Sequence, residues 1–264
     1  MEPKAASAQP KAGSFCWLEL ATTDQKAASR FYSDLFGWTA EDAPMGPDFT
    51  YTMLKSGGKD VGGAYTLMKE QVENHVPPHW MLYVKVRSAD EFAARAVELG
   101  GRQIVAPSDI PEVGRFAVVQ DPTGAFISVF EAGKNSGMTT FGDVGALCWA
   151  DLNTPDPEKA SKFYADWLGW TYETGEDAYR HIVNGTGEED MIGGIPPEMH
   201  APPGTPANWL PYFHVADCRA TAAKAARLGA SAILPASLMA DVGTIAVLAD
   251  PQGAVFALYQ PLAR

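Results

Sequence analysis

Two stretches of the chain place apolar side chains at the spacing of an amphipathic helix. In the first, apolar side chains recur three and four residues apart, at Ala28, Phe31, Tyr32 and Leu35. This spacing puts them on one face of a helix. Asp24 stands where an N-cap belongs and Gly37 where a helix ends. Asp156, Pro157 and Gly169 frame the second stretch in the same way, so the pattern predicts two equivalent helices.

Around these helices the hydrophobic pattern changes to the period of two that is typical of β-strands. Strands are predicted at 15–21 and 147–153, at 81–86 and 210–215, and in closing hairpins that turn at Asp121-Pro122-Thr123-Gly124 and Asp250-Pro251-Gln252-Gly253. One face of each strand is plain hydrocarbon, as at Cys16, Leu18 and Leu20. The other face mixes aromatic and polar groups, as the lining of a small-molecule pocket does. Its members are Trp17, Glu19, Met81, Tyr83, Lys85, Phe126, Ser128 and Phe130 in the first half, and Trp149, Asp151, Leu210, Tyr212, His214, Ala257 and Tyr259 in the second.

The same pattern occurs twice in the chain. CWLELATTDQKAASRFYSDLFGW begins at residue 16, and CWADLNTPDPEKASKFYADWLGW begins at residue 148. Further along, Gly62-Gly63 corresponds to Gly193-Gly194. An internal repeat of this length indicates duplicated units, so we expect an α+β fold of four βαβββ modules, paired into two domains. The predicted boundaries are a disordered tail at 1–13, domains at 14–132 and 146–264, and a linker at 133–145.

Composition narrows the classes of partner. The chain has 264 residues, of which 46% are hydrophobic and 20% charged, as in globular proteins. A formal net charge of -12 disfavours nucleic acid and anionic membrane surfaces as partners. Three cysteines argue against a disulfide framework and predict a reducing, cytoplasmic compartment. The N-terminal residues lack the apolar region of a signal peptide, and no apolar run is long enough to span a bilayer.

Taken together, these motifs resemble a known superfamily. A strand, a helix ending in Phe-Tyr-x-x-x-x-Gly-Trp, a Gly-Gly pair and a late Asp-Pro-x-Gly turn are similar to the vicinal-oxygen-chelate domains of glyoxalases, bleomycin-resistance proteins and extradiol dioxygenases. The similarity is greatest to tandem glyoxalase-like proteins, some of which are called hydroxylases, and it covers residues 14–132 and 146–261. It implies that paired modules form curled mixed sheets, each shaped as a cup with the site on its concave side.

The resemblance also implies where a metal would bind. Enzymes of this superfamily hold a divalent ion with His, Gln and Glu. Carried over to this chain, those positions fall on Trp17 and Trp149, on the two glycine pairs, on Met81 and Leu210, and on Ser128 and Ala257. None of these side chains is the carboxylate, imidazole or thiolate that such ions prefer. We therefore expect no metal and no other cofactor at the family site.

Ionisable side chains on the same faces are candidates for chemistry. Glu19 with Lys85, and Asp151 with His214, are predicted as acid–base pairs in which His214 moves a proton near neutral pH. The alternative is a buried salt bridge that closes the sheet. Trp17 and Trp149 serve either as stacking platforms for an aromatic ligand or as fillers of the space that a metal would take. Met81, Tyr83, Phe126, Ser128, Phe130, Tyr212 and Tyr259 are predicted to complete the binding surfaces.

Three functions remain open from the sequence. The first is a metal-free protein that binds a small hydrophobic or aromatic molecule, as bleomycin-resistance proteins do. The second is a metal-independent isomerase, lyase or hydroxylase-like enzyme. The third is a metal-dependent lyase or dioxygenase whose site has moved to other residues. In each case the partner is a small molecule, and the chain is expected to be a monomer with an internal pseudo-twofold axis or a homodimer.

Overall fold

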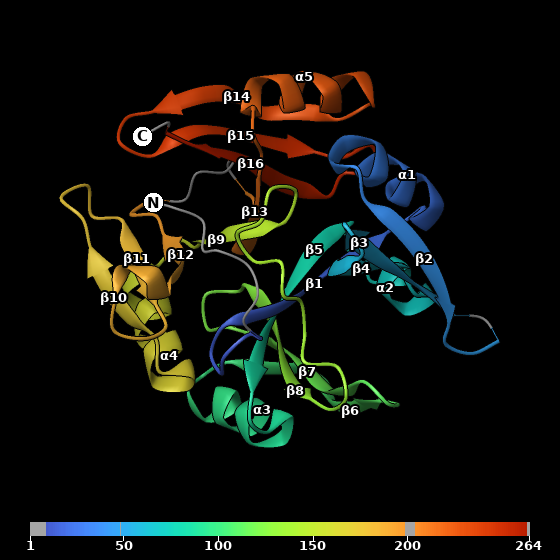
Figure 1. Cartoon of the computed structure of the whole chain (residues 1–264). Coiled ribbons are helices and arrows are strands. Elements are labelled where there is room, and N and C mark those ends of the chain that lie inside the picture. Colours follow the sequence, from blue (N-terminus) through green and yellow to red (C-terminus); the bar gives the residue numbers. More distant parts are fainter. Residues whose placement is uncertain (1–8, 48, 199–203, 263–264) are drawn as a thin grey trace.

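The chain forms two similar eight-stranded mixed sheets in its described part (Figure 1). The computed structural model describes residues 9–47, 49–198 and 204–262. In spatial order the first sheet contains β2 (Thr39–Pro44), β3 (Thr50–Ser56), β4 (Lys59–Thr66), β1 (Phe15–Thr22), β5 (His79–Val86), β8 (Phe126–Ala132), β7 (Gly114–Gln120) and β6 (Arg102–Ile110). The second repeats this order with β10 (Thr171–Thr174), β11 (Arg180–Val183), β12 (Met191–Ile195), β9 (Leu147–Asn153), β13 (Asn208–His214), β16 (Val255–Pro261), β15 (Gly243–Ala249) and β14 (Ser231–Met239). The predicted α+β class and the duplication are thereby confirmed.

The helices are α1 (Gln25–Phe36), α2 (Lys69–Glu73), α3 (Ala89–Glu98), α4 (Pro157–Leu168) and α5 (Cys218–Arg227), with a 3₁₀ turn η1 (Glu188–Asp190). The two helices predicted from the amphipathic pattern are present as α1 and α4. The Asp24 carboxylate accepts a hydrogen bond from the Ala27 amide at 2.9 Å, and Asp156 does the same for Lys159 at 3.0 Å. Gly37 and Gly169 both have φ 75°, the left-handed conformation that ends a helix.

A β-bulge in the first strand of each half changes the predicted facing. Phe15 pairs with Val84 and Trp17 with Tyr83, so Cys16 is left over; Cys148 is left over in the same way on β9. The prediction that Cys16 shares the hydrocarbon face with Leu18 and Leu20 is therefore wrong. An extra residue breaks the alternation of side chains, and Phe15 takes the core position while Cys16 packs against Tyr83 and Phe130 on the opposite face.

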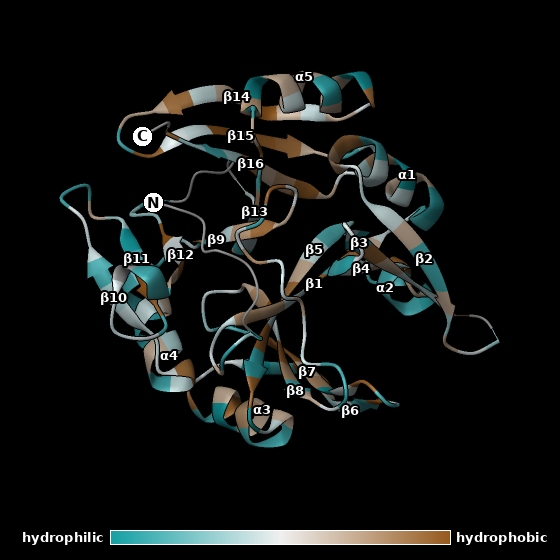
Figure 2. Cartoon of the chain, viewed as in Figure 1, coloured by the Kyte–Doolittle hydropathy of each residue, from teal (hydrophilic) through white to brown (hydrophobic). Residues whose placement is uncertain are grey.

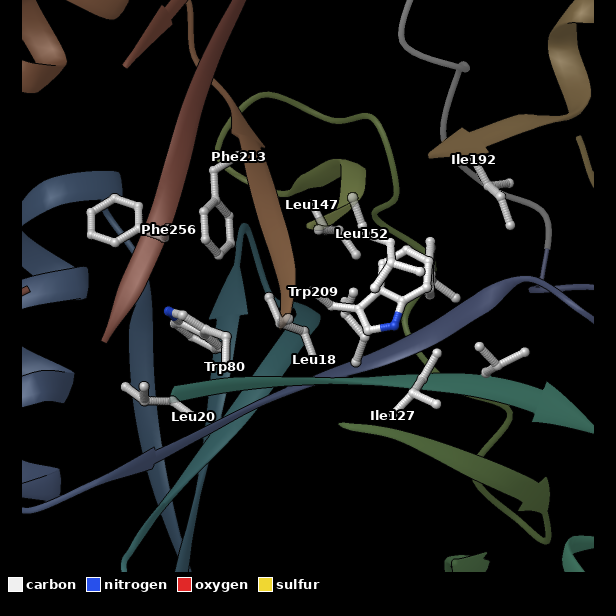
Figure 3. Close-up of a cluster of buried hydrophobic side chains, with 14 of the residues drawn as sticks. Leu18, Leu20, Trp80, Ile127, Leu147, Leu152, Ile192, Trp209, Phe213 and Phe256 are labelled. Carbon is white, nitrogen blue, oxygen red and sulfur yellow. The ribbon is translucent and has the colours of Figure 1, made fainter. Parts of the chain in front are cut away.

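The two sheets pack against each other through one hydrophobic core. Leu18, Leu20, Trp80 and Ile127 of the first half meet Leu147, Leu152, Ile192, Trp209, Phe213 and Phe256 of the second (Figure 3). Trp80 and Phe213 have ring centroids 5.6 Å apart, and so do Phe15 and Trp209. The central strands contain many hydrophobic residues, whereas the outer turns of α1, α3 and α5 contain hydrophilic ones (Figure 2). The halves are thus repeated units that share a core.

Hydrogen bonds between the halves use the repeated motifs. Trp80 donates to the Tyr32 hydroxyl at 3.0 Å, and Tyr32 donates to Asp250 of the other half at 3.0 Å. Trp209, Tyr164 and Asp121 form the reciprocal chain with the same two distances. Helix α1 packs on α5 and α3 on α4 (Figure 1). The Asp-Pro-x-Gly turns, expected only to reverse the chain, also bind the tyrosine of the opposite half.

The predicted tail and linker also pack on the protein. The Trp170 indole donates to the Gly13 carbonyl at 2.8 Å, and Asn184 donates to the Ala12 carbonyl at 3.0 Å. Residues 11–13 of the expected tail therefore contact the second half. Residues 1–8 lie outside the described part of the chain. In the linker, Met138 and Thr140 are buried.

Candidate functional site

Each sheet turns a second face away from the shared core, and most of the side chains predicted to line a pocket cluster on this face. In the first half a cluster of side chains lies there, comprising Cys16, Trp17, Met81, Tyr83, Val113, Phe116, Phe130 and Ala132. In the second half the corresponding cluster comprises Cys148, Trp149, Leu210, Tyr212, Ile245, Val247, Ala257 and Tyr259. We call these surfaces the first cup and the second cup. Because their aromatic side chains are only partly buried at several positions, they offer apolar area to a ligand.

A carboxylate held by tyrosines lies in the first cup. The Tyr83 hydroxyl donates to Glu19 Oε1 at 2.8 Å, and the Tyr51 hydroxyl also bonds this carboxyl group. The indole of Trp17 donates to the Tyr51 hydroxyl at 2.8 Å. Burial raises the pKa of Glu19 above its ordinary value, against the opposing effect of the two tyrosine hydrogen bonds. Burial raises the pKa of Tyr51 and Tyr83 as well, so both hydroxyls stay protonated donors.

The second cup repeats this arrangement around Asp151. Tyr179 donates to Asp151 Oδ1 at 2.6 Å, and Tyr212 donates to Oδ2 at 2.7 Å. The Trp149 indole lies 3.0 Å from Asp151 Oδ1 and 2.9 Å from the Tyr179 hydroxyl. Asp151 is 7% exposed. Each cup therefore has one carboxyl group, two tyrosine hydroxyls and one indole in mutual hydrogen-bond contact.

The glycine pair makes room for this cluster. Gly63 lies opposite Glu19 in the strand register, and Gly194 lies opposite Asp151. A Cβ on Gly63 would stand 2.2 Å from the Tyr51 hydroxyl oxygen, and one on Gly194 would stand 1.8 Å from that of Tyr179. The second glycine of each pair is thus required so that a tyrosine from the neighbouring strand can reach the carboxylate.

The residues present do not fit the divalent ion of the superfamily. The positions implied by the resemblance hold indole, glycine, aliphatic and small side chains, and Ser128 is buried with its hydroxyl donating to the Ala117 carbonyl at 2.9 Å. Among residues 9–47, 49–198 and 204–262, no group of three or more His, Cys, Asp and Glu side chains could hold a metal ion. The Glu19 carboxyl group of the first cup already accepts hydrogen bonds from the Tyr51 and Tyr83 hydroxyls. Burial raises the pKa of both hydroxyls, so they stay protonated, and protonated phenols are poor metal ligands.

The predicted acid–base pairs are not brought together. Asp151 lies opposite Leu210 and His214 opposite Tyr259, so four residues of β13 separate them. At about 3.3 Å per residue this is roughly 13 Å along the strand. His214 Nδ1 instead lies 2.9 Å from the Gly142 carbonyl. Glu19 and Lys85 are separated in the same way, with Glu19 opposite Met81. Side chains on one face of a sheet are neighbours only where the strand register pairs them, and the sequence pattern does not determine the register.

The other predicted residues fall into two groups. Trp17, Met81, Tyr83, Phe130, Trp149, Tyr212 and Tyr259 line the cups, and Tyr259 also donates to the Val242 carbonyl at 2.9 Å. Phe126 is 41% exposed and lies outside the first-cup cluster, at the start of β8.

Tyr51, Tyr179 and His181 were missed by the sequence reasoning. Tyr51 lies on β3, His181 lies on β11, and Tyr179 lies just before β11. These are the third strands of their modules, and the sequence pattern does not predict which way their side chains face. A tyrosine precedes the Gly-Gly pair in both halves, which is the signal that could have found them. The signal is weak because the loop between the tyrosine and the glycines differs in length between the halves.

The fold and the two cups define a tandem protein of the vicinal-oxygen-chelate class, and comparison with known proteins agrees. Residues 17–130 and 149–259 match the glyoxalase-like domain family. The chain belongs to this family.

Relatives at higher identity extend over nearly the whole chain. A Mycobacterium tuberculosis protein named "Putative glyoxylase CFP32" is 37% identical over 248 residues, which cover 93% of this chain and 94% of the relative. "Anthracycline biosynthesis protein DnrV" of Streptomyces peucetius is 31% identical over 275 residues, covering 94% and 93%.

Among solved structures, the Mn(II)-bound glyoxalase from Novosphingobium aromaticivorans has a TM-score of 0.65 at 16% identity, covering 96% of this chain and 83% of that one. The 2,3-dioxygenase LapB from Pseudomonas sp. KL28 has a TM-score of 0.65 at 12% identity, covering 97% and 94%. At these identities the structures show the shared fold.

Proposed function

We propose that this protein binds a small aromatic or hydrophobic molecule in its two cups and recognises it without a metal ion. The observation that carries the proposal is the repeated cluster of one carboxyl group, two tyrosine hydroxyls and one indole. A buried carboxyl group bound by neutral donors offers hydrogen bonds to a polar ligand group. The surrounding aromatic side chains offer stacking and apolar contact to the rest of the ligand.

The names of the relatives support an aromatic ligand class. DnrV is named for anthracycline biosynthesis, and anthracyclines are polycyclic aromatic compounds that carry hydroxyl and carbonyl groups. Such a molecule has a flat apolar face for Trp17 or Trp149 and hydroxyl groups at its edge that can donate to the tyrosine and carboxyl oxygens. A neutral ligand of this type fits the acceptors in each cup better than a strongly charged one does.

A second candidate function is proton transfer by the same carboxyl groups. The raised pKa of Glu19 favours it, because a carboxyl group that holds its proton at higher pH can act as a general acid. In that case the protein would be a metal-independent isomerase or lyase acting on the bound molecule. Glu19→Gln would then abolish turnover of a bound compound while leaving its binding within about twofold.

Titration with the neutral aglycone of an anthracycline tests the main proposal. The aglycone is preferred because the amino sugar of a complete anthracycline is a cation, which a chain of net charge -12 attracts without specificity. Tryptophan fluorescence and calorimetry should give saturable binding, weakened about tenfold at one site by Trp17→Ala and at the other by Trp149→Ala. Phe126→Ala, outside the cup, is the matched control and should leave binding unchanged. Absence of saturable binding would contradict the proposal.

A further inference from the structure

His181 gives the second cup a polar group that the first cup lacks. On the cup-facing side of the second sheet, the strand register places Glu173, His181, Gly194 and Asp151 in one row across β10, β11, β12 and β9. Side chains at paired positions of neighbouring strands point to the same face. Since Gly194 has no side chain, the Tyr179 hydroxyl lies over it and bonds the carboxyl group of Asp151.

The imidazole is held in place by aromatic rings. Its centroid lies 4.8 Å from that of Tyr179, at an interplanar angle of 65°, and 6.1 Å from that of Trp149, at 71°. Both neighbours belong to the hydrogen-bonded cluster around Asp151. Edge-to-face contacts of this kind are favourable and fix the ring plane. His181 is thus positioned by the same side chains that form the candidate site.

Both ring nitrogens of His181 lack a hydrogen-bond partner among the described residues, although the side chain is half-buried. The contrast with other histidines is clear. His214 Nδ1 lies 2.9 Å from the Gly142 carbonyl, and His79 Nδ1 lies 2.8 Å from the Pro77 carbonyl. A neutral imidazole has one donor and one acceptor. In this ring neither bonds another described residue, so both are open to a hydrogen bond with a ligand.

The first cup has a methionine at the corresponding place. Its row consists of Glu41, Met53, Gly63 and Glu19, in the same register across β2, β3, β4 and β1. The two rows therefore differ at two positions. Glu19 stands where Asp151 does, which keeps a carboxyl group, and the Met53 thioether replaces the His181 imidazole. Methionine is flexible and apolar and packs well against rings. The chain thus contains a natural comparison in which surroundings are shared and the hydrogen-bonding group is changed.

We propose that His181 contacts the ligand of the second cup and selects an aromatic ring that carries a hydroxyl or carbonyl oxygen. The first cup, with Met53 in the equivalent position, takes the same kind of ring without that requirement. The two cups of one chain would then differ in specificity, the second being the more selective for oxygenated rings. This inference rests on the proposed binding function and assigns His181 as its specificity-determining residue.

Matched probes test the inference on the full chain. 1-Naphthol and naphthalene share a ring system and differ in one hydroxyl group, and calorimetry can resolve two sites per chain. We expect one site to prefer 1-naphthol about tenfold more strongly than the other does, as one net hydrogen bond of about 1.4 kcal/mol gives. His181→Met should remove that difference, and Met53→His should create the preference at the other site.

A second variant separates loss of the hydrogen bond from loss of packing. His181→Phe keeps a ring against Tyr179 and Trp149 and removes both nitrogens, so it should fold, still bind naphthalene and lose the 1-naphthol preference. An unchanged preference in His181→Met and His181→Phe, with both probes still bound, would overturn this inference alone. Binding of neither probe by the wild type would overturn the proposed function and this inference with it.

Discussion

Neutral donors hold the carboxyl group of Glu19 in the first cup. Its partners are the Tyr51 and Tyr83 hydroxyls, and burial raises its pKa above the ordinary value of 4.5. A nearby cation would have the opposite effect and lower the pKa. The protonated form is therefore favoured by folding, and the native state binds a proton that the unfolded chain releases at lower pH.

This shift predicts how stability depends on pH. At pH values between the unfolded and folded pKa of Glu19, the native state binds more protons than the unfolded state. The stability that this group contributes is therefore fully present below its ordinary pKa of 4.5. It is lost as the pH rises through the pKa of Glu19 in the folded protein. Glu19→Gln removes the titration and keeps an acceptor for Tyr83. In urea unfolding from pH 4 to pH 8, the variant should therefore gain stability relative to the wild type as pH rises. A pH-independent difference, or one of opposite sign, would contradict the assignment.

Substitution of the second glycine of each Gly-Gly pair should affect both the stability of the fold and ligand binding. Gly194→Ala would place a methyl group at the position of the Tyr179 hydroxyl, and Gly63→Ala would do the same to Tyr51. The tyrosine must move off the carboxylate, at a cost of about 1–3 kcal/mol in the free energy of unfolding. Each variant should also lose ligand binding in its own cup only. Gly187→Ala is a useful control for steric effects, because its Cβ would stand 3.5 Å from the nearest atom of Glu189 and its φ lies outside the left-handed region.

At the scale of elements, α1 and α4 each contribute a tyrosine that bonds a turn of the opposite half. The Asp250 carboxylate accepts from the Gln252 and Ala254 amides, which shape its turn, and from Tyr32 on α1 of the other half. The Asp121 carboxylate likewise accepts hydrogen bonds from the Gly124 amide of its own turn and from the Tyr164 hydroxyl on α4 of the other half. The turn and the helix thus stabilise each other across the boundary between halves.

Removing one of these hydroxyls should cost stability in a predictable way. Tyr32→Phe leaves the Trp80 indole and the Asp250 carboxylate each without one buried partner, which costs about 1–3 kcal/mol. Tyr164→Phe should cost a similar amount. The two losses of stability should add, because the two hydrogen-bond chains share no residue. Urea unfolding of the single and double variants measures this. A cost below about 0.5 kcal/mol would show that the hydrogen bonds do not hold the halves together.

The sequence predicted the elements better than their contacts. Helix bounds, the Asp-Pro-x-Gly turns and the carboxylate of the first strand followed from periodicity and the repeat. The bulge at Cys16 and Cys148 did not, because an extra residue in a strand leaves the local pattern almost unchanged. Register was also out of reach, so Asp151 and His214 were wrongly paired. Contacts such as Tyr32 with Asp250 depend on tertiary packing, which a local pattern does not encode.

At the scale of the whole molecule, the two halves share a single core. Buried residues of both sheets form one cluster, and each half covers hydrophobic surface of the other. No helix in the described ranges is long and apolar enough to span a membrane. Since pairing of the halves within one chain buries this surface, we expect a monomer to be stable, with the homodimer as the alternative that sedimentation distinguishes.

A shared core predicts cooperative unfolding. The full chain should show one transition in calorimetry, with equal calorimetric and van't Hoff enthalpies. A chain that ends after residue 145 should be unfolded or aggregated, because Trp80, Leu18 and their neighbours would be exposed to water. Two separate transitions, or a folded isolated half, would contradict the description of one core.

We propose that a tyrosine-bound carboxyl group takes the place of the superfamily's metal site in both cups. Elemental analysis tests this, after incubation of the purified protein with Mn(II), Fe(II), Ni(II) and Zn(II) and removal of unbound metal by gel filtration. We expect bound metal far below one equivalent per chain for every ion. One or two equivalents of a transition metal per chain, lost in a Glu19→Gln and Asp151→Asn double variant, would contradict it.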